Sequence, residues 1–216
     1  MCGRPSTEML LGSTNTFGGA PDLDTRPPEM ERSTLHDTIY RCHRCGYCHT
    51  SLDTLIEGAQ PVVASEEYQA LLLAGAVPRV ARYYLAQCLL LECADDYPGS
   101  AWAAIQAAWV CDDKNAEEQA RQCRDKALAL IARAEANGEW FAAQAGAAIA
   151  IKIDLYRRAG RFEEARELLL EIPSVEIDDI VLQVFAFQAS LIRDQDTRAY
   201  TIADVNLNGV RDGLPA

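Results

Sequence analysis

The chain has 216 residues, 49% of them apolar, and carries a formal net charge of −12 at pH 7. Residues 51–216 hold 15 basic and 26 acidic residues, whereas residues 1–50 are nearly neutral. Nucleic-acid affinity depends largely on lysine and arginine side chains that neutralise phosphates, so this charge argues against a DNA- or RNA-binding protein.

No segment predicts export or membrane insertion. The N-terminus lacks a charged region followed by a long apolar run, so we expect no secretory signal. The most apolar stretch, residues 142–151, is too short to span a bilayer. We therefore expect a cytoplasmic protein, in which eight cysteines indicate metal binding and buried thiols rather than a disulfide framework.

Composition divides the chain into three parts. Residues 1–50 are rich in glycine, proline, serine and threonine, which predicts an irregular, β-poor arm of zinc-ribbon type. Within it, residues 21–34 are either an extended, ordered loop or a solvated linker. Residues 51–194 show the apolar period of helices, and residues 195–216 read as a polar tail. The predicted fold class is mainly α: antiparallel helix hairpins in an irregular solenoid or bundle, with a small zinc-ribbon-like N-terminal segment.

Capping and breaking residues predict where the helices begin and end. Ser65 is a good N-cap, and Pro78 suits the first turn of the next helix. Asn115 is predicted to open a long helix, and Gly160 to turn one helix into the next. The short connections imply antiparallel neighbours.

The segment 151–173 resembles one tetratricopeptide repeat (TPR). Tyr156 stands at the end of its first helix, the sequence GRFEEA forms its turn, and Ala165 stands where two helices would approach most closely. The earlier helices match this pattern only loosely, and a solenoid needs about three repeats to bury its core. We therefore expect a TPR-like bundle rather than a regular array.

The sequence CHRCGYCH at residues 42–49 is the main candidate functional site. Two thiols at CxxC spacing followed by glycine form a metal knuckle, because the tight turn directs both sulfurs to one ion and Gly46 tolerates the positive φ of that turn. The pair Cys2-Gly3 reads as the second half of another knuckle. One knuckle provides two ligands, and a structural zinc site needs four.

Three interpretations of this site stay open. The first is a structural zinc site, in which His43, His49 or a cysteine upstream of residue 1 are alternatives for the fourth ligand. The second is an iron–sulfur cluster on the CxxCxxC spacing, although the usual trailing Cys-Pro is absent. The third is a site without metal, with free thiols. The metal ligands predicted by the first interpretation are Cys2, Cys42, Cys45 and Cys48.

The remaining cysteines lie in the predicted helices. Free cysteine is among the most buried residue types, so we expect all four to pack in the core. They are Cys88, Cys93, Cys111 and Cys123.

Four motifs resemble an uncharacterised bacterial family, domain-of-unknown-function family 2225. They are TFG at 16–18, DLDTRPPE at 22–29, CxxCGY at 42–47 and AWVCDD at 108–113. The resemblance spans nearly the whole chain and implies a two-knuckle cysteine N-terminus followed by TPR-like helices. The family pattern begins with a complete CxxCG, of which this sequence has Cys2-Gly3. The family has no assigned reaction, so the resemblance implies no catalytic residues.

Two classes of function fit these features. The first is a non-enzymatic protein-interaction scaffold with a structural zinc knuckle, whose acidic helices would bind a basic or amphipathic peptide in a groove beside the helix predicted over 140–158. The alternative is a redox- or zinc-responsive regulatory protein that acts through the knuckle thiols. Neither predicts a nucleic-acid or membrane partner.

Overall fold

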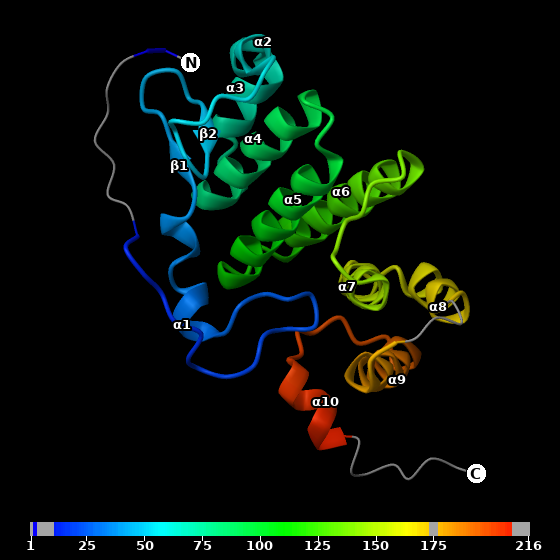
Figure 1. Cartoon of the computed structure of the whole chain (residues 1–216). Coiled ribbons are helices and arrows are strands. Elements are labelled where there is room, and N and C mark those ends of the chain that lie inside the picture. Colours follow the sequence, from blue (N-terminus) through cyan, green and yellow to red (C-terminus); the bar gives the residue numbers. More distant parts are fainter. Residues whose placement is uncertain (1, 4–10, 173–176, 209–216) are drawn as a thin grey trace, which may run out of the picture. The chain divides into compact units, whose positions relative to one another are not determined.

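A computed structural model describes residues 2–3, 11–172 and 177–208 of the chain (Figure 1). The described residues are mainly helical, with one small two-stranded sheet, which confirms the mainly α fold class. The elements are α1 (Glu29–Arg32), the 3₁₀ helix η1 (Leu35–Asp37), β1 (Tyr40–Arg41), β2 (Cys48–His49), α2 (Ala59–Ala64), α3 (Glu66–Leu73), α4 (Arg79–Cys93), α5 (Tyr97–Asp113), α6 (Glu117–Ala136), α7 (Ala145–Arg158), α8 (Phe162–Leu170), α9 (Asp179–Arg193) and α10 (Ile202–Asn208). None of these helices is long and apolar enough to cross a lipid bilayer.

The chain forms two compact units, and their boundaries differ from the predicted ones. The expected arm of residues 1–50 is divided between them, because the knuckle packs with the helices that follow it whereas residues 15–32 pack with the last helices. Among the described residues, the first unit contains 2–3, 11–14 and 33–141, and the second contains 15–32, 142–172 and 177–208.

The first unit is built around the antiparallel helices α4, α5 and α6, which lie side by side in Figure 1. Alanines are buried along α5, and their small side chains let the neighbouring helix backbones approach closely. The loops at both ends of α5 turn on residues in the left-handed region, Asp95 (φ 57°) and Asn115 (φ 54°). Asn115 therefore ends α5 rather than opening α6, since asparagine tolerates this backbone conformation.

Helices α2 and α3 cover one side of α4 and carry the knuckle. Ser65 caps α3 as predicted: its side chain accepts a hydrogen bond from the backbone N–H of Tyr68 at 3.2 Å. Tyr68 and Leu72 are buried against residues of the knuckle. The position of the knuckle therefore depends on the packing of α3.

The second unit consists of α7, α8, α9 and α10 together with residues 15–32. Gly160 has a φ of 79° in the turn between α7 and α8, and Ala165 is fully buried, as the predicted helix hairpin requires. Helix α7 begins five residues later than Trp140, where its predicted pattern starts. The assignment of this hairpin as a TPR stays a prediction.

The segment after α9 is not a solvated tail. The backbone N–H of Leu23 donates to the carbonyl of Tyr200 at 2.9 Å, and Ile202 N–H donates to the carbonyl of Pro21 at 2.9 Å. Val205, in α10, belongs to the core of the second unit. The prediction of a polar tail is thus wrong for residues 195–208, and residues 209–216 lie outside the described part.

The DLDTRPPE stretch is an ordered loop rather than a solvated linker. Its Asp24 is fully buried and accepts a hydrogen bond from Nη1 of Arg158, at the end of α7, at 3.0 Å. Asp24 also accepts the backbone N–H of Arg26 at 3.2 Å. The neighbouring Asp22 accepts from Arg32 Nη2 at 3.1 Å. Burial, which outweighs these cations, raises the pKa of Asp22 to about 6.

A second buried arginine ties α7 to the segment after α9. Arg157 is fully buried, and its guanidinium donates to Asp154 Oδ1 at 2.6 Å. It also donates to the backbone carbonyls of Asp196 (2.5 Å) and Arg198 (2.9 Å). In the interior of the second unit, hydrogen bonds from charged groups therefore join segments that are distant in sequence.

We expect Asp24→Asn to lower the free energy of unfolding by about 3 kcal/mol, because it removes the buried carboxylate to which Arg158 Nη1 donates. The measurement is urea unfolding followed by far-ultraviolet circular dichroism. Glu171→Gln, which also removes one negative charge but at an exposed position, is the matched control. Equal losses in the two variants would show that the Asp24–Arg158 pair is not stabilising.

Candidate metal centre

The CxxCG segment folds as a tight hairpin between β1 and β2, which pair antiparallel with Arg41 opposite Cys48. The backbone N–H of Cys42 donates to the carbonyl of Tyr47 at 2.8 Å, and Gly46 N–H donates to the carbonyl of Cys42 at 2.9 Å. Gly46 has a φ of 81°, which a side chain would strain. The residue types that predicted a knuckle thus produce its turn.

The Tyr68 hydroxyl anchors this turn to α3. It donates to the carbonyl of Gly46 at 3.0 Å and accepts the backbone N–H of Cys48 at 3.1 Å. Tyr68 is fully buried, so neither backbone group has water as an alternative partner there. The sequence did not indicate this role, because Tyr68 lies 22 residues from Gly46 and reads as one more apolar position of a helix.

Three of the four predicted ligands come together. The sulfurs of Cys2, Cys42 and Cys45 all lie within 4.8 Å of one another, and the Cys2 and Cys42 sulfurs are 3.8 Å apart. Two thiolates bound to a zinc ion at about 2.3 Å in tetrahedral geometry lie about 3.8 Å apart. These three cysteines could therefore hold a metal ion.

The thiol of Cys48 points elsewhere. It is fully buried and donates to the carbonyl of Gly46 at 3.3 Å, outside the group of three sulfurs. Burial raises its pKa to about 12. Of the alternative ligands, His43 is exposed, and His49 accepts the backbone N–H of Ser51 at Nδ1 (3.0 Å). The fourth ligand stays a prediction.

The knuckle backbone favours a thiolate at Cys42. Partial burial acts against ionisation, but the backbone N–H groups of Cys45 and Arg44 act on this sulfur, and the pKa of Cys42 falls to about 7. Burial raises the pKa of Cys45. A turn that holds a thiolate ligand must direct backbone N–H groups at its sulfur.

The other cysteines follow the core prediction with one exception. Cys88, Cys111 and Cys123 are buried between α4, α5 and α6. Cys93 is exposed, because it is the last residue of α4, where the helix ends at the surface. The expectation of burial is therefore wrong for Cys93.

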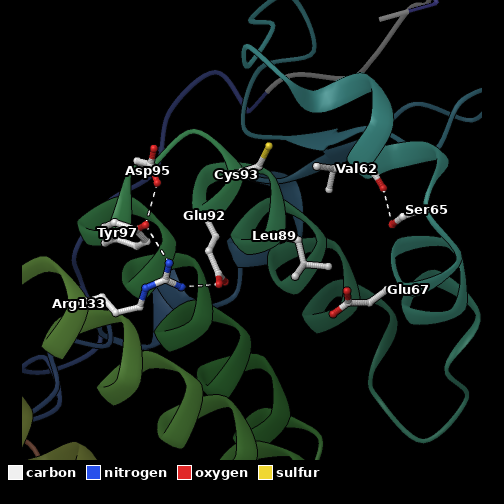
Figure 2. A pocket seen from close by; sticks show the side chains of 9 residues that line it. All are labelled: Val62, Ser65, Glu67, Leu89, Glu92, Cys93, Asp95, Tyr97 and Arg133. Atoms are coloured by element: carbon white, nitrogen blue, oxygen red, sulfur yellow. Dashed lines mark hydrogen bonds and ion pairs between the residues drawn. The ribbon is translucent and has the colours of Figure 1, made fainter.

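A pocket of about 420 Å³ lies in the same unit, between α4, the α2–α3 connection and α6 (Figure 2). Arg133 donates to Glu92 at 2.8 Å and to the Tyr97 hydroxyl at 2.8 Å, and the same hydroxyl donates to Asp95 at 2.7 Å. Glu67 points into the pocket from the opposite side in Figure 2. The lining combines acidic groups with the apolar side chains of Val62 and Leu89 and is completed by Ser65 and Cys93.

Comparison with known proteins adds no further information on function. No family model, curated protein or solved structure matches the chain. The function is therefore inferred from the chemistry of the metal centre and the pocket.

We expect Tyr68→Phe to lower the free energy of unfolding by about 2 kcal/mol, because the buried Cys48 N–H loses the hydroxyl it donates to and the Gly46 carbonyl loses one of its two donors. Urea unfolding measures this loss, and hydrogen exchange at the Cys48 amide should become faster. The control is Tyr83→Phe, at a nearby half-buried position in α4, which we expect to change stability by about 0.5 kcal/mol or less. Unchanged exchange at Cys48 would contradict an anchoring role for the hydroxyl.

Proposed function

We propose that the protein is a non-enzymatic interaction scaffold whose knuckle holds one structural zinc ion through Cys2, Cys42 and Cys45. The observation that carries this proposal is the convergence of three sulfurs from segments 40 residues apart. Zinc suits the site because it prefers thiolate ligands, and the 3.8 Å sulfur separation matches its tetrahedral geometry.

The proposed ion would fix the start of the chain to the knuckle. Cys2 and Gly3 are exposed, and the sulfur of Cys2 lies close to that of Cys42. A metal bond supplies binding energy that a short exposed segment cannot obtain from apolar packing. In contrast, the knuckle itself is already packed on α3 and α4. The structural role proposed for the metal is therefore limited to the segment around Cys2.

The scaffold proposal is supported by the pocket beside α4. Glu67 and Asp95 are exposed acidic residues on its rim, and Val62 and Leu89 provide apolar surface. A basic, amphipathic protein segment would match both properties. This pocket lies in the first unit, whereas the groove expected beside residues 140–158 involves the second and stays untested.

A redox- or zinc-responsive regulatory role is the second candidate. Cys2 is exposed and Cys42 and Cys45 are half-buried, so an oxidant in solution would reach the sulfurs. Oxidation would remove the thiolate ligands and release the ion. Zinc release by hydrogen peroxide that leaves peptide binding unchanged would separate this function from the scaffold.

Membership of domain-of-unknown-function family 2225 also stays a proposal. Its most distinctive motif here, DLDTRPPE, corresponds to the buried loop that pairs with Arg158. The CxxCGY motif contributes two of the three converging sulfurs, those of Cys42 and Cys45. These two observations give structural roles to the residues that carry the resemblance.

We expect the purified protein to contain about one zinc ion per chain, and Cys42→Ser or Cys45→Ser to lower that content several-fold, because each removes a thiolate ligand. Elemental analysis measures the metal, and circular dichroism should show that helical content persists. Cys93→Ser removes an exposed thiol outside the group and should keep full zinc content. Equal zinc loss in all three variants would refute the site.

The scaffold proposal is tested with a fluorescent amphipathic peptide that carries lysine and leucine at helical spacing. We expect its affinity to fall as salt rises and to fall about tenfold in Glu67→Lys, because the change puts a positive charge at the pocket. Fluorescence anisotropy measures binding. Glu171→Lys makes the same charge change at an exposed site in the second unit and should have little effect. Equal weakening by both variants, or tighter binding of a DNA duplex, would overturn the proposal.

A further inference from the structure

Two hydrogen bonds, one from its sulfur and one from its backbone N–H, hold Cys48 away from the candidate metal centre. Its sulfur donates to Gly46 O, and its backbone N–H donates to the Tyr68 hydroxyl. The same hydroxyl donates to Gly46 O, so the turn, α3 and Cys48 are bonded as one unit. Ligation by Cys48 would break a buried hydrogen bond and displace a fully buried side chain.

The described part of the chain contributes no other ligand to this group. Only the three thiols of Cys2, Cys42 and Cys45 satisfy the geometry of a shared ion there, and no described histidine, aspartate or glutamate joins them. Zinc in proteins is almost always four-coordinate when structural, and it keeps an exogenous fourth ligand when only three protein ligands are present. Three ligands from the described residues therefore leave one coordination position.

This position is accessible, and the sequence around the knuckle is basic. Cys2 is exposed, and the other two cysteines are half-buried, so the group lies at the surface. Between Asp37 and Asp53 the sequence contains Arg41 and Arg44 but no acidic residue, although the whole chain carries −12. Two basic residues without an acidic neighbour in sequence favour an anionic ligand.

We propose that the Cys2–Cys42–Cys45 centre binds its metal with three thiolates of this chain and accepts a small-molecule thiolate as the fourth ligand. This inference rests on the proposed metal site. A thiolate matches the soft sulfur set, and the knuckle cysteines have Arg41 and Arg44 as basic neighbours in sequence. The bound thiol forms a sulfur–metal bond and gives up its proton to solvent, with no change in oxidation state. The centre then senses or carries low-molecular-weight thiols.

The test uses Co²⁺ in place of zinc, because the sulfur-to-cobalt charge-transfer absorbance increases with the number of bound thiolates. Protein reduced with a phosphine, without added thiol, is titrated with Co²⁺ and then with 2-mercaptoethanol. We expect three bound thiolates first, and a rise in absorbance of about one third when the added thiol fills the fourth position. Cys48→Ala and the control Cys93→Ala should behave as the unaltered protein does.

Other results would overturn the proposal. Four-thiolate absorbance before thiol addition, reduced by about one quarter in Cys48→Ala, would make Cys48 the fourth ligand. The same starting absorbance retained in Cys48→Ala, with a dimer on size-exclusion chromatography, would assign the ligand to a second chain. An absorbance that does not respond to the added thiol would exclude an open position in the unaltered protein, whether or not Cys48→Ala folds. Failure to bind Co²⁺ would refute the proposed metal site itself.

Discussion

The two hydrogen bonds between the Tyr68 hydroxyl and backbone groups of the knuckle are the constraint on which the candidate metal centre depends. A hydroxyl both donates and accepts, so one side chain satisfies the Gly46 carbonyl and the Cys48 N–H together. This fixes the turn that places Cys42 and Cys45 side by side. It also keeps Cys48 in the core, so that the sulfur completing the group comes from Cys2.

The two units are held together by different kinds of interaction. In the first, small side chains on α5 permit close helix packing, and the knuckle is held by apolar contacts and the Tyr68 bonds. In the second, charged groups are buried, and hydrogen bonds pair Asp24 with Arg158 and Asp154 with Arg157. Such pairs add less to stability than apolar packing of the same volume, but they specify which segments must meet. Here they join residues 22–26 to α7 and Arg157 to the segment after α9.

The sequence around the candidate metal centre differs in charge from the rest of the chain. The knuckle carries arginines and no nearby acid in sequence, whereas the pocket beside α4 is rimmed by acidic residues. The first property is compatible with the proposed anionic ligand of a metal ion, and the second with the proposed basic protein segment. Binding of a thiol and of a peptide by the first unit would be compatible with both proposed functions.

The sequence alone determined the mainly helical class, most helix ends and the CxxCG turn, because capping, apolar periodicity and a required positive φ are local properties. It also indicated Cys2 as a candidate metal ligand, because the pair Cys2-Gly3 matches half of a knuckle. The tertiary structure decided the rest. Residues 1–50 are divided between two units, Asp24 is buried against Arg158, and residues 195–208 pack on the segment that contains Leu23. The partners in these contacts are distant in sequence, so no local pattern encodes them. Cys48 shows the same limit within the motif itself: CxxCxxC spacing makes it a candidate ligand, and only the packing of Tyr68 from α3 directs its thiol into the core.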